Sequence, residues 1–345
     1  MLEVDRERPG AYDSIEAAID VAENGDEIVV APGLYEVRAA IRFNATGARP
    51  VRNLVLRSSH GPDRTEIRLV ESTSSIFVFD AGEDSRSVVQ GFRIRGGKGT
   101  GGESDPFYSQ GGAIYCSGGS SPRFVDCKIT GQDIEGAGGA IACNNASPVF
   151  IGCDISQNTA RIGGAMLAGG PHSKPILKGC SIVGNRAREV PGILVGDEAI
   201  VTLEDCVVRG NHAELGLGAI RSDRGILHLE RVRFDGNTAR SAGAISCDAR
   251  SELTARNCVF VRNSVTSDAG AIYVGAGSKA ALSFCTIAYN TGPVHGGGAI
   301  FVTQSELVIE NSILWGNGFG PIYPPGESGI TIERSIVEGG WPGTG

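Results

Sequence analysis

Short runs of alternating hydrophobic and polar residues recur along this chain at a nearly constant interval after residue 110. The clearest run is Gly-Gly-Ala-Ile with an apolar residue two places after the isoleucine, as from Gly111 to Cys116. The second glycine of this motif falls at 112, 139, 164, 192, 218, 243, 270 and 298, so that the steps are 25 to 28 residues. A period of this length built from strands and turns is typical of a solenoid with one coil per repeat.

A second motif, Cys-x-[Ile/Val/Phe]-x-x-Asn, has the same period. It runs from Cys153 to Asn158, Cys180 to Asn185, Cys206 to Asn211, Cys258 to Asn263 and Cys285 to Asn290. We expect the cysteines to form an inward column of small apolar side chains. Neighbours about 4.8 Å apart would also be within disulfide range, so both states stay open. We expect the asparagines at a turn, where Asn tolerates a left-handed backbone and its amide can bond the next coil.

These patterns predict one all-β domain over residues 1–345: a single-stranded right-handed parallel β-helix with coils of about 26 residues. The Leu-x-x-Leu-x-Leu pattern of leucine-rich repeats is absent, and so are long amphipathic windows after residue 25. Residues 1–97 are expected to form an N-terminal cap and irregular coils, 98–110 a flexible insertion, and 111–345 regular coils. The last residues look like a coil that continues, which predicts a missing C-terminal cap.

The N-terminal segment predicts a short capping helix and four strands. Asp13-Ser14-Ile15-Glu16 fits a capping box that opens a helix ending near Glu23. A helix here would cover the open end of the solenoid and protect its unpaired strand edge. The expected strands are 27–30, 53–56, 66–70 and 76–79.

Composition and charge exclude several classes of protein. The chain has 345 residues, of which 51 are glycine, and a net charge of −8. An acidic chain is a poor partner for a nucleic-acid backbone, which basic faces bind. No run approaches the about 20 apolar residues of a membrane span, and the first residues do not resemble a signal peptide. We expect a monomer without nucleic-acid partners or a membrane span.

Two family resemblances can be named from these motifs. The segments Ser14 to Asp20, Gly25-Asp26 and Val30 to Tyr35 resemble the opening of pectin-lyase-like right-handed β-helices. The Gly-Gly-Ala-Ile and Asn repeats resemble those of polymorphic outer-membrane proteins, which are surface passengers and adhesins. The resemblance implies a secreted or cell-surface protein whose partner is a polysaccharide or cell-surface glycan. It does not imply one activity, because the first group includes lyases, hydrolases, esterases and proteins that are not enzymes.

The repeat also predicts one chemically rich face. Strand residues alternate sides, so if Ile114 and its equivalents point inward, the next residues point outward. That outward row is expected to be Tyr115, Ala142, Leu167, Val195, Arg221, Ser246, Tyr273 and Phe301. A second row two positions on is expected to be Ser117, Asn144, Gly169, Asp197, Asp223, Asp248, Gly275 and Thr303.

Three consecutive carboxylates in the second row are the main catalytic candidates. Asp197, Asp223 and Asp248 could bind Ca²⁺ and bridge it to a uronic acid, with Arg221 holding the substrate carboxylate or acting in β-elimination. Asp197 and Asp248, two coils apart, would alternatively suit an inverting glycosidase. The simplest alternative is a solvated acidic stripe balanced by arginines.

Further residues are expected to contact substrate or to line the same cleft. Tyr273, Phe301, Tyr115, Arg224 and Arg188 are the expected substrate-binding residues. Loop residues His212, Glu214, His295, Arg186 and Glu189 could line the cleft or form ordinary surface contacts.

Two functions therefore stay open. One is a polysaccharide-binding or polysaccharide-cleaving protein, lyase-like or hydrolase-like if catalytic, and the acidic and aromatic face favours it. The other is a non-catalytic surface or adhesive solenoid, which the short regular loops favour.

Overall fold

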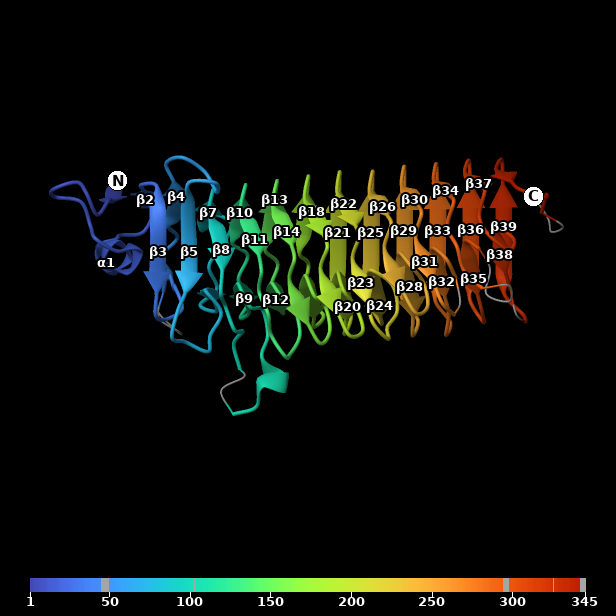
Figure 1. The fold of residues 1–345 in the computed structure, drawn as a ribbon, viewed down its shortest axis with the longest axis horizontal. Coiled ribbons are helices and arrows are strands. Elements are labelled where there is room, and N and C mark those ends of the chain that lie inside the picture. The colour runs from blue at the N-terminus through green and yellow to red at the C-terminus, as the bar shows by residue number, and fades with distance from the viewer. Residues whose placement is uncertain (45–49, 102–103, 268, 294–297, 325, 342–345) are drawn as a thin grey trace.

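The computed structural model describes residues 1–44, 50–101, 104–267, 269–293, 298–324 and 326–341. Its coils stack into a straight rod with the two termini at opposite ends (Figure 1). The predicted all-β right-handed parallel β-helix is confirmed, and every pair of strands along the rod is parallel. None of the helices in the described part of the chain has both the length and the apolar character needed to cross a bilayer.

Three long sheets form the sides of the rod, and we call them A, B and C; sheets A and B begin in the first coils, and sheet C begins at β6. Sheet A contains, in order, β1 (Leu2–Val4), β2 (Glu27–Val30), β4 (Val55–Ser58), β7 (Val88–Gln90), β10 (Arg123–Val125), β13 (Val149–Ile151), β17 (Ile176–Lys178), β21 (Ile200–Glu204), β25 (Ile226–Glu230), β29 (Glu252–Arg256), β33 (Lys279–Ser283), β36 (Glu306–Glu310) and β39 (Gly329–Glu333). Sheet B contains β3 (Gly33–Val37), β5 (Thr65–Leu69), β8 (Arg93–Arg95), β11 (Lys128–Thr130), β14 (Asp154–Ser156), β18 (Ser181–Val183), β22 (Val207–Arg209), β26 (Arg233–Asp235), β30 (Val259–Val261), β34 (Thr286–Ala288), β37 (Ile313–Trp315) and β40 (Ile336–Val337).

Sheet C is built from the Gly-Gly-Ala-Ile repeats. It contains β6 (Phe77–Phe79), β9 (Ile114–Cys116), β12 (Ile141–Asn144), β16 (Met166–Gly169), β20 (Ile193–Gly196), β24 (Ile220–Asp223), β28 (Ile245–Asp248), β32 (Ile272–Val274), β35 (Ile300–Val302) and β38 (Ile322–Tyr323). A short sheet D lies between sheets B and C in the chain and contains β15 (Thr159–Ala160), β19 (Arg186–Ala187), β23 (His212–Ala213), β27 (Thr238–Ala239) and β31 (Ser264–Val265).

The core is a set of inward columns, as expected from strand alternation. Ile114 and Cys116 are fully buried, and their equivalents stack above them on sheet C. Aromatic side chains stack inside as well, with the rings of Phe124 and Phe150 5.3 Å apart. All nine cysteines are buried and free. The cysteines of the second motif therefore form the predicted inward column, and of the two states left open the structure has the free thiols.

The asparagine column is a hydrogen-bonded ladder. The backbone N–H and Nδ2 of Asn158 both donate to Oδ1 of Asn185 at 3.0 Å, and the pattern repeats at each coil to Asn317. The expected bond to the next coil is therefore confirmed. The left-handed backbone was expected at the asparagine itself, and this is wrong by one residue. The positive φ angle belongs to the residue before each asparagine, such as Gln157 or Gly184.

The N-terminal cap has one helix, α1 (Ile15–Val21), which lies at the end of the rod (Figure 1). Its N-cap is Ser14, whose hydroxyl accepts from the Ala17 N–H, so the predicted capping box is placed one residue too early. Of the four expected strands, 27–30 is β2, and the other three shift by one or two residues. The predicted insertion projects from the rod and includes the 3-10 turn η1 (Pro106–Tyr108), while residues 102–103 lie outside the described part.

Candidate functional site

The outward side of sheet C carries the predicted face, with one correction of register. The strand β20 pairs Leu194, not Val195, with Leu167 and Arg221. Val195 is fully buried, so its predicted place in the outward row is wrong. The coil before β20 places Gly192 where Ala165 and Ala219 stand in the neighbouring coils, which the glycine spacing alone could not reveal.

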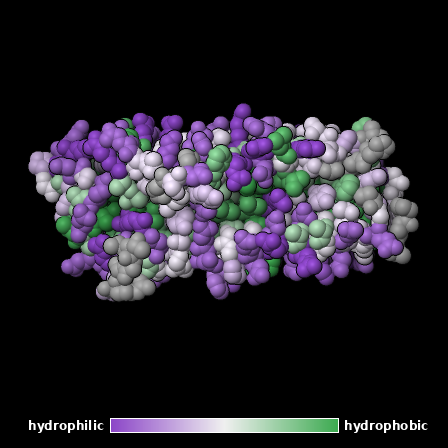
Figure 2. All heavy atoms as spheres, turned by 90° about the horizontal axis from the view of Figure 1, so that it is seen from below, coloured by the Kyte–Doolittle hydropathy of each residue, from purple (hydrophilic) through white to green (hydrophobic). Residues whose placement is uncertain are grey.

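The outer row is therefore Tyr115, Ala142, Leu167, Leu194, Arg221, Ser246, Tyr273, Phe301 and Tyr323. Ala142 and Ser246 belong to this row but are fully buried between larger neighbours. Figure 2 shows hydrophobic residues gathered mid-length, between hydrophilic ones, on the side of the rod seen from below.

The same correction removes Asp197 from the carboxylate column. Gly196, not Asp197, stands opposite Asp223, and Asp223 stands opposite Asp248. Asp197 lies in the following turn with a φ of 51° and accepts from Arg224 Nη2 at 2.6 Å. The predicted column of three carboxylates is wrong, and a pair on neighbouring coils remains.

The two remaining carboxylates have different partners. Asp223 accepts from Arg221 Nη2 at 3.1 Å, and both side chains are partly exposed. Asp248 accepts from the Ala249 N–H at 2.9 Å and forms no ion pair with any described residue. The strand spacing puts their backbones about 4.8 Å apart, so the two carboxylates can act on one group.

On the outward side of the strands, two buried polar atoms beside this pair have no hydrogen-bond partner within the described residues. They are Arg221 Nε and Ser246 Oγ, which belong to residues facing each other across β24 and β28. A buried donor or acceptor without a partner costs about 1 to 3 kcal/mol. Such atoms mark a place where a water molecule or a ligand hydroxyl is expected.

An aromatic ridge continues the outer row toward the C-terminus. The rings of Tyr273 and Phe301 stack with centroids 5.4 Å apart, and Tyr323 follows 5.7 Å from Phe301. The ring of Tyr273 also leans over Gly275, since a Cβ there would lie 2.6 Å from its Cε1. Tyr273 and Phe301 thus lie on one face with the carboxylate pair.

Of the other predicted substrate-binding residues, Tyr115 and Arg188 lie apart from this group, whereas Arg224 lies in the turn directly after Asp223. Tyr115 stands four coils from Arg221 in the outer row, near Asn144, whose Nδ2 is 3.4 Å from its hydroxyl. Arg188 is exposed in the loop before β20, at the opposite end of the strand from Asp223. Arg224 is held by Asp197, which raises the pKa of the guanidinium.

The loop residues show ordinary surface contacts. His212 Nδ1 lies 2.7 Å from Thr238 Oγ1, and Arg186 stands opposite His212 on sheet D. Glu214 is exposed, and Glu189 lies 3.8 Å from Arg161. His295 lies outside the described residues.

The described residues of this face do not form a preorganised calcium site. Within the described residues, no group of three or more His, Cys, Asp or Glu side chains is arranged to hold a metal ion. Calcium binding stays a prediction, which would rest on Asp223 and Asp248 with oxygen ligands from water or substrate.

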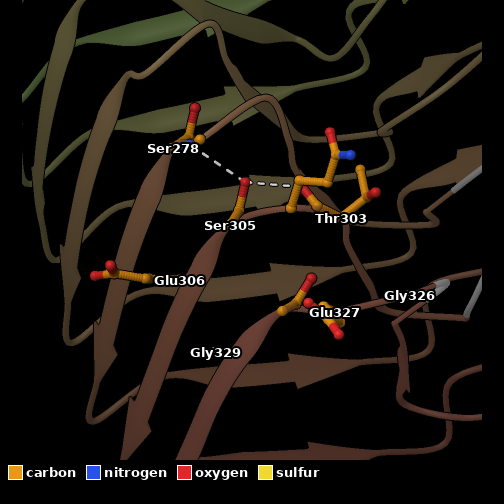
Figure 3. Close-up of a pocket in the computed structure, with 10 residues that line it drawn as sticks. Ser278, Thr303, Ser305, Glu306, Gly326, Glu327 and Gly329 are labelled. Carbon is orange, nitrogen blue, oxygen red and sulfur yellow. Dashed lines mark hydrogen bonds between the residues drawn. The ribbon is translucent and has the colours of Figure 1, made fainter.

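Two hollows lie on the turns that follow sheet C. One, of about 450 Å³, is lined by Glu198, Arg224 and Arg250 beside the carboxylate pair. The other, of about 850 Å³, lies toward the C-terminus (Figure 3). There Ser305 Oγ accepts from the Ser278 N–H and donates to Thr303 O, and Glu306 pairs with Lys279, so the side chains of Ser305 and Glu306 are already engaged.

The glycines and Ser246 were missed as site residues. The register of the repeats predicts the row to which a residue belongs. It placed Ser246 correctly in the outer row, and Gly169 and Gly275 correctly in the second row. The open space above a glycine, or a missing partner for a hydroxyl, depends on coordinates.

Comparison with solved structures finds other β-helices at low identity. The A-module of a mannuronan C-5 epimerase from Azotobacter vinelandii has 10% identity and a TM-score of 0.49 over 93% of this chain and 92% of that one. A PL6 family polysaccharide lyase from Pseudopedobacter saltans has 13% identity and a TM-score of 0.46 over 95% and 92%. A GH87 α-1,3-glucanase from Streptomyces thermodiastaticus has 14% identity and a TM-score of 0.45 over 95% and 66%.

Sequence comparisons give the family but no individual relative. No characterised protein matches the chain significantly. The family profile described as "Right handed beta helix region" matches residues 81–229 and 220–343, which together are most of the chain. The chain therefore belongs to the right-handed β-helix family.

Proposed function

We propose that this protein binds a polysaccharide along the outward face of sheet C and works outside the cell, where such chains are met. The observation that carries the proposal is the register: an aromatic ridge, a guanidinium and two carboxylates stand on successive coils of one straight face. A row of groups repeating about every 4.8 Å suits a linear polymer better than a compact ligand. Few polar groups beside apolar surface are typical of a binding site.

The ridge offers apolar edges together with phenol hydroxyls. Because Tyr273 and Phe301 stack on each other, their ring faces are engaged, and the ridge presents edges to solvent. Tyr323, at its end, is 37% exposed. A sugar chain lying beside this ridge would bury apolar C–H groups and keep its hydroxyls near Arg221 and the carboxylates.

Hydrolysis is a second candidate function, favoured by the carboxylate pair. Two carboxyl groups about 5 to 5.5 Å apart suit a retaining glycosidase, in which one is the acid and the other the nucleophile. Asp223 and Asp248 on neighbouring coils fit this spacing better than the inverting one. A purely adhesive solenoid would use the same face without turnover.

Affinity electrophoresis in gels that contain single polysaccharides tests the proposal. We expect retardation by at least one glycan, and Phe301→Ala should reduce it because the middle of the ridge is lost. Trp315→Ala is the matched control, since Trp315 is 50% exposed on sheet B. Equal retardation of the two variants, or no retardation by any glycan, would contradict the proposal.

A further inference from the structure

The second row of sheet C has a floor made of two glycines, Gly169 and Gly196. A Cβ on Gly196 would meet only the Asp223 carbonyl oxygen at 3.9 Å, and one on Gly169 only Asn144 Oδ1 at 3.7 Å. Both residues are in strands, and neither has a positive φ. The backbone does not require glycine at either place, and the result of having it is open space, which we call the glycine shelf.

The shelf has defined sides and ends. Leu167 and Leu194, in the outer row, lie along one side. At one end Asn144 donates to Gln110 Oε1 at 2.6 Å. At the other end come Asp223 and Asp248. From Asn144 to Asp223 is three coil steps, or about 14 Å.

Past the carboxylates the row is closed by an aromatic ring. Tyr273 leans over Gly275, the glycine that follows Asp248 in the row, and Gly275 is buried as a result. The open part of the row therefore lies on the Gly196 side of the carboxylates.

The unpartnered atoms lie past the carboxylate end of the shelf, in the outer row, on the coils one and two steps from Gly196. Ser246 is fully buried, and its Oγ is on the outward side of β28, between Arg221 and Tyr273. Arg221 stands opposite Ser246 across the strands, and its Nε is also without a partner in the described structure. A hydroxyl that enters between Arg221 and Tyr273 could accept from Nε and bond Ser246 Oγ at once.

From this arrangement we infer that the glycine shelf is a subsite for a neutral, hydroxyl-bearing sugar unit. The inference rests on the proposed function and names its ligand class. The apolar side of a pyranose ring would lie against Leu167 and Leu194, and one hydroxyl would satisfy Arg221 Nε and Ser246 Oγ.

The charges around the glycine shelf favour a neutral sugar over a uronate. Arg221 already pairs with Asp223, and Asp248 stands on the next coil without a counter-ion among the described residues. A uronate carboxylate here would add a third anion beside Arg221, which Asp223 already engages. Of the two arginines in the following turns, Arg224 is engaged by Asp197, and Arg250 lies in the turn after Asp248. The protein as a whole has a net charge of −8. A hydroxyl adds no charge, so the site prefers neutral polysaccharides.

A filled shelf tests the inference. In Gly196→Phe, the ring occupies the shelf, while the extended backbone accepts a side chain without strain. Gly329→Phe is the matched control, because Gly329 is an exposed strand glycine of sheet A, also without a positive φ. Binding of soluble β-glucan, mannan, xylan, alginate and polygalacturonate is measured by isothermal titration, with thermal melting to confirm the fold of each variant.

We expect tighter binding of a neutral glycan than of the two uronates, a loss of at least tenfold in Gly196→Phe, and unchanged affinity in Gly329→Phe. Ser246→Ala should weaken binding about two- to tenfold, the value of one hydrogen bond. It should not lower the melting temperature, because the deleted hydroxyl is unsatisfied in the free protein. If Ser246 binds only water, Ser246→Ala will have the same affinity as the unsubstituted protein, and this result would contradict the inference.

Failure of the subsite is distinguishable from failure of the proposed function. If Phe301→Ala weakens binding but Gly196→Phe does not, the face binds glycan and the shelf is not its subsite. Tighter binding of alginate or polygalacturonate would overturn the neutral class alone. Absence of binding to every glycan would overturn both.

Discussion

Asn185 and Asn211 occupy the same place on successive coils, and Asn185 gives both its backbone N–H and its Nδ2 to Oδ1 of Asn211 at 3.0 Å. Asn211 Nδ2 in turn donates to Ile182 O at 2.9 Å. Both asparagines are fully buried. Each side chain of the ladder therefore satisfies groups of the coil before it, and removing one leaves buried donors and an acceptor without partners.

Asn211→Ala is expected to destabilise the protein by about 2 to 4 kcal/mol, because at least two buried polar groups lose their partners at about 1 to 3 kcal/mol each. Chemical denaturation measures the change. The control is Asn257→Gly, which keeps a positive φ and removes only an exposed bond to Glu230. A similar decrease in the free energy of unfolding in both variants would show that the ladder stabilises the protein no more than an exposed hydrogen bond does.

The buried thiols are expected to resist modification by thiol reagents in the folded protein. Burial raises the pKa of Cys116 and of Cys143, and raises that of Cys247 to about 12. At these three positions the reactive thiolate is therefore scarce at neutral pH, and at all nine the burial of the side chain blocks access of a reagent. Ellman's reagent should titrate almost no thiols in buffer and nine in denaturant without reductant. Fewer than nine in denaturant would indicate disulfides, and rapid labelling in buffer would contradict the burial.

Asp235 is expected to make the fold sensitive to acid. Burial alone would raise its pKa, but hydrogen bonds from Arg262 and Arg233 outweigh that effect and lower it. A carboxylate with a depressed pKa stabilises the fold at neutral pH, and this stabilisation is lost as the pH falls below about 4 and through the depressed pKa.

Asp235→Asn should therefore cost about 1 kcal/mol at pH 7, a modest value because the two arginines are well exposed. The difference should vanish near pH 2 in melting curves recorded across pH. Asp205→Asn is the control, since Asp205 pairs with Arg231 on the open surface and should show no measurable loss. A difference that grows in acid would contradict the sign.

The fold was predictable because its cause is repeated in every coil. Ile114, Cys116 and the asparagines recur at matching places, so one mistaken coil cannot hide the period. The site was less predictable because register depends on where a coil gains or loses a residue. Aligning on Gly192 put Asp197 in the carboxylate row, whereas aligning on the inward residues Ile193 and Val195 would have put Gly196 there.

The carboxylate pair yields a last prediction that also tests the register. If the face hydrolyses its glycan, new reducing ends should appear without unsaturated products, and Asp223→Asn or Asp248→Asn should lower the rate by about 10² to 10⁴, the usual loss of an acid or base. Binding should persist in both variants, because asparagine has nearly the same size as aspartate.

Asp197→Asn is the matched control: the carboxylate of Asp197 lies in the turn against Arg224, so the rate should stay near that of the unsubstituted protein. A rate that falls as far in Asp197→Asn would return Asp197 to the reacting group, whereas full activity in Asp223→Asn and Asp248→Asn would exclude the pair. An absence of products from every glycan that binds would leave adhesion as the function of this face.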